Sequence, residues 1–540
     1  MQDIKEQIKT AIKKVYDIDF EPEVVPAPEN VEADYSTNAP LKLAKDLHKA
    51  PMEIAKELET FIKDSNVSNP GFLNITLADE YLKERVGEFK EDIKSSTHED
   101  QVVIAEFSDP NPFKVLHVGH LYTSIMGDAI SRLYENAGAK VIRANFGGDV
   151  GLHVAKTMYI LMQKNPDTLT IEDIGKCYVE GTAAYEDDEV AHAKITELNK
   201  EIYKINAEDI HGTPLADLYW KGRELSYQYF NDFYASIGVK FDKYYPESSV
   251  AGLGLSIVER ELKNGVYEKS DGAVIFDGDK YGLHTRVFIN KEGVPTYEAK
   301  DVGLIFQKDK DYHFDKSVVI TGSEQLEYMK VVLKSVEQYA PELVAKTSHL
   351  THGLVKLPGN VKMSSRKGNF LKAVDVIDLV KNALKDTYNS TDEKVVLAAI
   401  KYAFLKYKMG GNIIFDPNES VKMTGNSGPY LLYSAVRAKK ILANCHSDLR
   451  YVYIYNIYER NLAKKILEYE AVLNEATVEM APHKLANYLY ELAQEFSRFY
   501  ENCPVAGSEE ECERAKLVET YLKVMTHGLG LLGIEIPEEM

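Results

Sequence analysis

The chain has 540 residues, of which 44% are hydrophobic and 27% are charged, as is ordinary for a water-soluble globular protein. This length exceeds what one hydrophobic core usually serves, so we expect roughly two to four domains. The formal net charge is −20, from 64 basic and 84 acidic residues, which excludes a protein whose whole surface coats nucleic acid. Local basic patches remain compatible with RNA binding.

The cysteines and the amino terminus indicate a cytoplasmic protein. Cys177, Cys445, Cys503 and Cys512 are scattered and contain no CxxC pair, so neither a disulfide framework nor a cysteine zinc site is expected. The amino terminus carries both charge signs and lacks the apolar segment of a signal peptide. No apolar run approaches the roughly 20 residues that span a bilayer, so no membrane contact is expected.

Residues 1–97 form the first predicted unit. Apolar residues recur at helical spacing over Ile4–Val15, which predicts an amphipathic first helix. Two more helices are expected on either side of Pro51, and the alternating segment Phe72–Leu77 predicts a strand. The acidic run after Arg85 is expected to be helical and solvated. The unit is therefore predicted to be a small α+β domain without chemistry of its own.

A strand–helix–strand pattern marks the next unit, residues 98–420. Val102–Ala105 is a short buried strand, a Pro-rich loop and an amphipathic helix follow, and Val141–Phe146 is the next strand. This pattern predicts a Rossmann-like parallel sheet with a ligand site at the carboxyl ends of its strands. An acidic helical insertion is expected near 156–250. Further strands are expected at Gly272–Phe276, Arg286–Ile289 and Ser317–Thr321.

The last unit, residues 421–540, is predicted to be an all-α helical bundle. From about Thr391 onward, apolar residues keep a helical face. One such face consists of Leu485, Leu489, Leu492 and Phe496. The fold class is thus α/β, with a Rossmann-like catalytic domain that carries insertions, flanked by a small α+β domain and a helical bundle.

The motif His117-Val-Gly-His120 follows the first strand of the parallel sheet, where the chain turns into a helix. Gly119 lets the backbone approach a bound group closely, and the helix end offers N–H donors to phosphates. Two imidazoles three residues apart share a helix face and can donate to phosphate oxygens. Alone, such a pair is more often a coincidence or half of a zinc site. Its strand–loop–helix setting, without a third ligand at fixed spacing nearby, favours a nucleotide site.

A second motif, Val361–Asn369, lies about 240 residues downstream. It combines three cations, two hydroxyls and a glycine, which suits a loop that neutralises a leaving pyrophosphate. The alternative is a solvated basic loop, which is what most such clusters are. The two motifs together, in this order across an α/β domain, favour the nucleotide site.

This pair of motifs resembles the HIGH and KMSKS signatures of the class I aminoacyl-tRNA synthetases. Ser108, Pro110, Asn111 and Lys114 resemble the arginyl branch in particular, and the similarity extends over nearly the whole chain. The resemblance implies a ligase that activates arginine with ATP and esterifies it to tRNA. It also implies a cytoplasmic monomer, Mg²⁺ carried with the nucleotide, and no structural metal.

The chain departs from these signatures in two places. Ser365 stands where the second motif usually has lysine, and the resemblance implies that Lys114 substitutes for it on the phosphates. Val150 stands where the family often has tryptophan. The catalytic residues that the resemblance implies are Lys114, His117, His120, Lys362 and Arg366. The ATP-binding residues that it implies are His117, Gly119, His120, His352, Gly353, Lys362, Met363 and Ser364.

A site for arginine must meet a planar, permanently charged guanidinium, which carboxylates do through charge-assisted hydrogen bonds. Glu106 ends the first strand, and Asp301 lies at the start of a predicted helix, so these two carboxylates are the expected guanidinium pair. Which of the two makes the bidentate contact is left open. Without the resemblance, Asp301 would be a helix-terminal charge and Tyr297 a packed aromatic. The resemblance adds Tyr297, Gln325, Asn111 and His117 to the arginine site.

The segment Asn426–Arg437 resembles the start of the family's anticodon-binding domain. Tyr430, Tyr433 and Arg437 lie at three- and four-residue spacing, so one helix face can offer them for stacking on bases. The alternative is that the tyrosines close the bundle core, which we expect for at least one of them. Arg498 is a further tRNA-binding candidate with the same ambiguity. The resemblance also implies that the amino-terminal unit touches the tRNA elbow.

Two other functions remain open. An adenylate-forming relative that works without tRNA is disfavoured by the helical last domain and by Tyr297 and Asp301. A catalytically silent tRNA-binding paralogue predicts loss of the active-site histidines or loop cations. His117, His120 and Lys362 are all present, which disfavours that reading.

Overall fold

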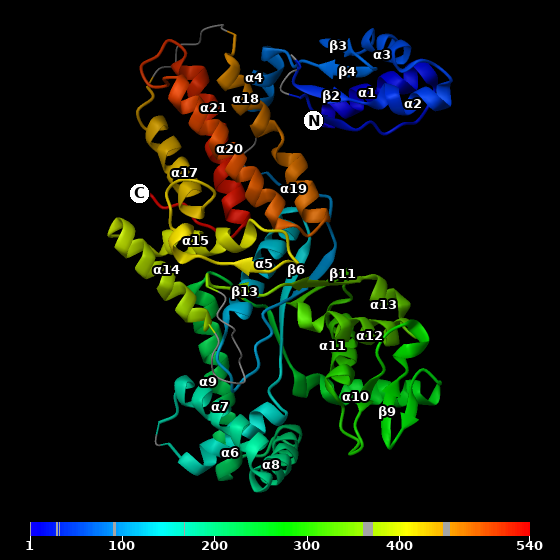
Figure 1. The fold of residues 1–540 in the computed structure, drawn as a ribbon, viewed down its shortest axis with the longest axis vertical. Coiled ribbons are helices and arrows are strands. Elements are labelled where there is room, and N and C mark those ends of the chain that lie inside the picture. Colours follow the sequence, from blue (N-terminus) through cyan, green and yellow to red (C-terminus); the bar gives the residue numbers. More distant parts are fainter. Residues whose placement is uncertain are drawn as a thin grey trace.

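The computed structural model describes residues 2–28, 31, 33–89, 93–166, 168–359, 371–446 and 454–540. In Figure 1 a parallel sheet lies at the centre, with a helical bundle above it and two lobes below it. The amino-terminal unit, in blue, lies beside the upper end of the bundle. Within the part of the chain described, no helix is long and apolar enough to cross a membrane.

The amino-terminal unit is a small α+β fold, as predicted. Three helices pack on an antiparallel sheet of order β1-β2-β4-β3. Its elements are α1 (Gln2–Tyr16), β1 (Val24–Pro26), β2 (Tyr35–Thr37), α2 (Ala39–Leu47), α3 (Pro51–Glu59), β3 (Ser65–Ser68) and β4 (Phe72–Ile75). Ile4, Ile8 and Ile12 of α1 enter its core, which confirms the amphipathic helix.

The expectation of a helical run after Arg85 is wrong. Helix α4 (Asp79–Gly87) ends two residues later, and residues 93–97 contain no helix. Leu82 and Val86 are its buried residues. Beyond Gly87, Phe89 packs against the main core and Ile93 is buried in it, so these residues reach the core without continuing the helix.

The central sheet has five parallel strands in the order β12-β11-β5-β6-β7, which confirms the Rossmann-like prediction. Its strands are β5 (Val102–Glu106), β6 (Lys140–Gly147), β7 (Lys243–Pro246), β11 (Lys316–Gly322) and β12 (Thr347–His352). Helix α5 (Val118–Asn136) connects β5 to β6, and it packs on both. Strand β5 is central, so its carboxyl end at Glu106 lies between Val319 of β11 and Ala144 of β6.

Two lobes extend from the sheet (Figure 1). The helical lobe has its own core and consists of α6 (Leu152–Lys164), α7 (Ile171–Asp187), α8 (Glu189–Ala207) and α9 (Pro214–Ser236). The mixed lobe consists of α10 (Glu247–Lys263), β8 (Glu268–Ser270), β9 (Ala273–Phe276), η1 (Gly278–Tyr281), β10 (Arg286–Ile289), α11 (Tyr297–Tyr312), η2 (Ser323–Gln325), α12 (Leu326–Glu337) and α13 (Pro341–Ala345). The predicted strands β9 and β10 exist, but they form a separate antiparallel sheet with β8.

The carboxyl-terminal part is helical apart from a small two-stranded ribbon, β13 (Val355–Lys356) and β14 (Ile413–Ile414). Its helices are α14 (Ala373–Tyr388), α15 (Glu393–Leu405), α16 (Pro417–Ser420), α17 (Gly428–Leu442), α18 (Ile457–Leu467), α19 (Tyr469–Val478), α20 (Pro482–Asn502) and α21 (Glu511–Leu531). The predicted apolar face of α20 is fully buried in the bundle.

Polar bridges join α5 to the bundle. Arg132 Nη1 donates to the carbonyl of Gly530 at 3.3 Å, and Asn136 Oδ1 lies 3.0 Å from His527 Nε2. The first turn of α5 begins at the histidine motif, so this one helix runs from the candidate nucleotide site to the bundle.

Candidate active site

His117 and His120 form a stacked pair at the amino terminus of α5. Their ring centroids lie 3.8 Å apart. His117 Nδ1 accepts a hydrogen bond from the Gly119 N–H, and His120 Nδ1 accepts one from the His117 N–H, both at 3.1 Å. These bonds satisfy two backbone donors that the start of a helix leaves open. The predicted placement of the pair at a helix start is confirmed.

Both imidazoles are neutral at neutral pH. Burial, and then the nearby Lys114 ammonium, lowers the pKa of His117 to about 4. Burial, and then His117, holds the pKa of His120 well below its usual value. A neutral imidazole carries one proton, and because each Nδ1 accepts a hydrogen bond, that proton is on Nε2. Each ring therefore offers an Nε2–H donor without a positive charge.

Gly119 and Lys114 adjoin this pair. A Cβ at position 119 would lie 2.8 Å from Cε1 of His117, so any side chain there would displace the ring. Lys114 Nζ lies 4.8 Å from the ring centroid of Tyr178 on α7, and it is close enough to the histidines to lower their pKa values. Lys114 thus brings a positive charge to the pair from the side of the helical lobe.

His352 ends β12, and its ring centroid lies 4.8 Å from that of Tyr122 on α5. It is buried, and its Nδ1 donates to the carbonyl of Gly353 at 2.7 Å. Burial lowers its pKa, so its ring is neutral and Nε2 is left as an acceptor. A Cβ on Gly353 would lie 2.4 Å from the carbonyl oxygen of Gly411, so a close backbone approach requires this glycine.

Four predicted residues of the second motif lie outside the described residues: Lys362, Met363, Ser364 and Arg366. The chain that follows them is attached to the first motif. The Val118 N–H donates to the carbonyl of Leu371 at 2.9 Å, and the Ala373 N–H donates to the carbonyl of Leu116 at 3.0 Å. The described chain directly after the second motif therefore lies beside the first motif, at the start of α5.

Glu106 is engaged by a buried lysine that the sequence analysis missed. Lys308 Nζ lies 2.6 Å from Oε2 of Glu106 and 3.0 Å from Oγ of Ser317. The side chains of Glu106 and Lys308 are 3% and 1% exposed. Lys308 follows Asp301 by two helical turns on α11, and this spacing was the available signal that both face the same side.

Asp301 lies close to Glu106 in a buried acidic cluster. The hydroxyl of Tyr328 on α12 donates to Oδ2 of Asp301. Burial raises the pKa of Asp301 to about 8; the Tyr328 hydrogen bond opposes the rise and the charge of Glu106 adds to it. Burial, and then Glu106, also raises the pKa of Asp109, whose Oδ1 accepts from the Phe146 N–H at 2.8 Å. Three carboxyl groups thus face one ammonium, which suits a cationic ligand.

The other predicted arginine-site residues lie on separate elements of the catalytic domain. Asn111 Oδ1 accepts from the Gly148 N–H at 2.7 Å and so holds the turn after β6. Tyr297 begins α11 and is 53% exposed, with Lys300 Nζ 5.0 Å from its ring centroid. Gln325 is exposed in η2, directly before α12.

A second buried pair, also missed from sequence, ties the lobes together. Lys300 Nζ lies 2.7 Å from Oε2 of Glu247 on α10 and 2.9 Å from the hydroxyl of Tyr203 on α8.

Val150, the departure from the family pattern, is fully buried in the core of the helical lobe. It therefore has a packing role here.

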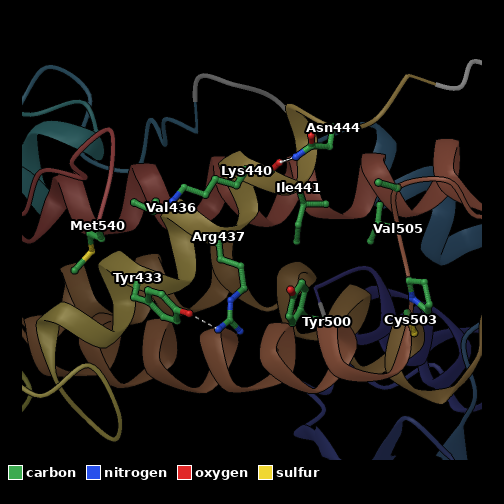
Figure 2. A pocket seen from close by; sticks show the side chains of 12 residues that line it. Tyr433, Val436, Arg437, Lys440, Ile441, Asn444, Tyr500, Cys503, Val505 and Met540 are labelled. Atoms are coloured by element: carbon green, nitrogen blue, oxygen red, sulfur yellow. Dashed lines mark hydrogen bonds between the residues drawn. The ribbon is translucent and has the colours of Figure 1, made fainter.

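Aromatic and guanidinium groups line a cavity of about 430 Å³ on the bundle, shown in Figure 2. The Arg437 guanidinium lies 4.6 Å from the ring centroids of both Tyr433 and Tyr500. Its Nη2 also donates to the Tyr433 hydroxyl at 2.8 Å. Lys440 and Met540, which no sequence pattern indicated, also line the cavity.

The two other candidates for tRNA contact are placed differently. The Tyr430 hydroxyl lies 3.1 Å from Ser497 Oγ, and its ring lies 5.8 Å from that of Tyr490 within the bundle. Arg498 is exposed and pairs with Glu495 at 2.6 Å. Tyr430 therefore packs between helices, whereas Arg498 lies on the open surface.

Comparison with known families gives three matches in chain order. The family described as arginyl tRNA synthetase N terminal domain matches residues 2–77. The family described as tRNA synthetases class I (R), catalytic domain, matches residues 86–416. The DALR anticodon binding domain matches residues 431–540.

Individual proteins are similar along most of the chain. An arginine–tRNA ligase from Porphyromonas gingivalis is 30% identical over 87% of this chain and 86% of its own length. One from Flavobacterium psychrophilum is 29% identical over 87% of this chain and 85% of its own. The solved arginyl-tRNA synthetase of Thermus thermophilus shares the fold, with a TM-score of 0.80, 24% identity and full coverage of both chains.

The catalytic-domain match covers more than half of the chain, and its range includes the histidine pair and the acidic cluster. The two flanking matches coincide with the amino-terminal α+β unit and with most of the helical bundle. This chain therefore belongs to the class I arginyl-tRNA synthetase family.

Proposed function

We propose that this arginine–tRNA ligase activates arginine and transfers it to tRNA at the carboxyl edge of the central sheet, where different residues bind the guanidinium, the phosphates and the adenine. The supporting observation is that a neutral histidine pair and a buried acidic cluster flank the carboxyl end of β5. The pair suits the phosphates of ATP, and the cluster suits the guanidinium of arginine.

Glu106 and Asp301 would share the guanidinium. Tyr328 engages Oδ2 of Asp301, and Lys308 engages Oε2 of Glu106. Each carboxylate therefore has a second oxygen to offer, and a planar guanidinium can bridge the two with separate N–H groups. Because the site is built of buried polar groups, an analogue without the guanidinium would leave them unpaired and be rejected strongly.

The residues at the edge of the cluster would complete the arginine site. Tyr297 and Gln325, both exposed, are proposed to lie along the arginine side chain at the mouth of the pocket. Asn111 and His117 lie on the β5–α5 connection, between the acidic cluster and the start of α5. This placement suits contact with the amino and carboxylate groups of arginine.

His117 and His120 would donate from Nε2–H to the phosphates of ATP, with Gly119 allowing close approach. The arginine carboxylate attacks the α-phosphorus, and the bond to the β-phosphate oxygen breaks to release pyrophosphate. Lys114 and the α5 amino terminus would stabilise the added charge, and so would Lys362 and Arg366. The terminal hydroxyl of tRNA then attacks the activated carbonyl, and AMP leaves. Catalysis is thus chiefly positioning and charge stabilisation.

His352 would accept a hydrogen bond from the amino group of adenine at its free Nε2. Gly353 would pack the strand end beneath the base, and Met363 and Ser364 would contact the nucleotide from the second motif.

Mg²⁺ would arrive with ATP and neutralise phosphate charge. Within the described residues no group of three or more His, Cys, Asp or Glu is arranged to hold a metal ion. Imidazole and ammonium groups do not suit a cation that prefers oxygen ligands.

The cavity on the bundle would take a base of the tRNA. Arg437 between Tyr433 and Tyr500 offers planar surfaces for stacking. Arg498 would contact the RNA backbone from the open surface, and Tyr430 would support the cavity from inside the bundle. By the same family relation we infer a cytoplasmic monomer whose amino-terminal unit touches the tRNA elbow.

Arginine-dependent exchange of pyrophosphate into ATP, with and without tRNA, tests the proposal. We expect exchange with arginine and only background exchange with lysine or glutamate. Equal exchange with lysine would refute the arginine assignment, and no exchange under either condition would favour a silent paralogue. Asp301→Ala should raise the KM for arginine far more than the KM for ATP, and equal effects would remove Asp301 from the pocket.

A further inference from the structure

Tyr328 contacts Asp301 directly, although neither the sequence motifs nor the reaction requires a tyrosine there. It lies in the first turn of α12 and donates its hydroxyl to Oδ2 of Asp301 on α11. Burial, and then Asp301, holds the pKa of Tyr328 well above its usual value. The phenol therefore stays protonated, and it acts as a hydrogen-bond donor to the Asp301 carboxyl group.

Arg286 of β10 stacks on the Tyr328 ring. Its guanidinium carbon lies 5.3 Å from the ring centroid, and its Nη1 donates to Oε1 of Glu298 at 3.2 Å. Glu298 lies three residues before Asp301 on α11, so Arg286 attaches the ring to the helix that carries the carboxylate. Among the described residues, Nε of Arg286 has no hydrogen-bond partner although it is buried. Arg286 therefore stacks on Tyr328 and pairs with Glu298, although this position leaves its Nε–H donor unsatisfied.

We infer that Tyr328 is a positioning residue for arginine recognition, which fixes the Asp301 carboxylate so that its other oxygen meets the guanidinium, and that Arg286 fixes Tyr328. This inference rests on the proposed arginine site. Without the hydroxyl, the carboxylate could rotate about its last side-chain bond, and part of the binding free energy would be needed to order it again. The residue would thus act on arginine affinity through Asp301 and not by touching the substrate.

The charged groups around Asp301 determine how removal of the hydroxyl affects its titration. Glu106 of β5 and Glu247 of α10 raise its pKa, and Lys308 of α11 lowers it. Asp109, in the loop after β5, also lies within electrostatic reach. The Tyr328 hydrogen bond is the largest of the effects that lower this pKa. Its loss should therefore move the titration of Asp301 to higher pH.

Tyr328→Phe tests the inference because it keeps the ring and its stacking on Arg286 and removes only the hydroxyl. Since a hydrogen bond to a charged group is lost, we expect the KM for arginine to rise roughly tenfold or more, with kcat and the KM for ATP within about twofold. The pH at which arginine binding is half-maximal should move upward. Arg286→Lys, which keeps the charge and loses the planar stack, should raise the KM for arginine by a smaller factor.

Tyr267→Phe is the matched control. Tyr267 belongs to the same apolar cluster of the lobe, and its hydroxyl bonds to Ser335 and Tyr339, both at 3.1 Å. A purely structural role for Tyr328 predicts that both Phe variants leave the KM for arginine and its pH midpoint unchanged, and that result would overturn the inference. Wild-type protein without arginine-dependent exchange would instead overturn the proposed function, and the inference with it. An active wild type with an unaffected Tyr328→Phe variant refutes the inference alone.

Discussion

The carboxylate of Glu106 and the ammonium of Lys308 lie 2.6 Å apart inside the catalytic domain, with 3% and 1% of their side chains exposed. The pair neutralises the charge of Glu106 at the carboxyl end of β5. Asp301 has no such ion pair among the described residues, so its charge depends on the bound ligand.

Lys308→Met should destabilise the protein, because it leaves a buried carboxylate without its counter-charge. We expect the free energy of unfolding to fall by about 3–5 kcal/mol, measured by urea denaturation. Adding Glu106→Gln to Lys308→Met should recover part of this loss. The control is Lys330→Met, which breaks an exposed pair with Glu327 and should cost less than about 1 kcal/mol. Equal losses at the two lysines would contradict the buried-pair explanation.

His117→Asn should separate the structural role of this residue from its catalytic role. An asparagine oxygen can replace Nδ1 as acceptor for the Gly119 N–H, so the start of α5 should keep its stability to within about 1 kcal/mol. The Nε2–H donor is lost, and kcat in the exchange reaction should fall by about 10²–10³-fold. Unchanged kcat with a melting temperature equal to wild type would show that His117 only caps the helix.

Gly119→Ala should impair catalysis through the His117 ring. The new Cβ would lie 2.8 Å from Cε1 of His117 and push the imidazole off its cap, so kcat/KM for ATP should fall by about tenfold or more. Gly252→Ala is the control on α10, where a Cβ meets no atom within 4 Å. It should leave the kinetics unchanged and stabilise the helix by up to about 1 kcal/mol. Equal kinetics for the two variants would show that the site tolerates a side chain at 119.

Arginine binding should tighten as the pH rises towards 8. In the free protein, burial raises the pKa of Asp301 to about 8, so below that pH the carboxyl holds a proton that a bound guanidinium must displace. The apparent Kd should therefore fall by up to about tenfold per pH unit below 8 and become constant above it. Calorimetry at pH 7 in buffers of different ionisation enthalpy should detect proton release, and Asp301→Asn should abolish it. A Kd that is constant from pH 6 to 9 would contradict the expected titration.

Arg437→Lys should weaken tRNA binding by about tenfold, because lysine keeps the charge but loses the planar surface between Tyr433 and Tyr500. Filter binding measures the Kd for tRNA, and the KM for arginine should not change. Arg498→Lys keeps a solvated charge in an exposed ion pair and should change the Kd by less than about twofold. A larger effect at Arg498 would place the main RNA contact outside the cavity.

Sequence patterns alone were enough to predict the domain order, the parallel sheet and the histidine pair at a helix start. These depend on local patterns, namely the apolar periodicity of α20, the buried strand before Glu106, and the His117–His120 spacing at a helix start. Because each of these patterns spans only a short stretch of sequence, it can be recognised without knowledge of the fold. The run after Arg85 misled because its apolar residues Phe89 and Ile93 reach the core outside a helix, which their spacing does not indicate.

The pairing of charges inside the site became visible only in the folded protein. Lys308, Tyr328 and Tyr500 lie far along the chain from the residues that they contact or flank. The role of a buried polar group depends on its partner, and no local sequence pattern identifies that partner. The protonation of Asp301 and the tautomer of His117 follow from the same cause, because desolvation and hydrogen bonding act only once the chain has folded.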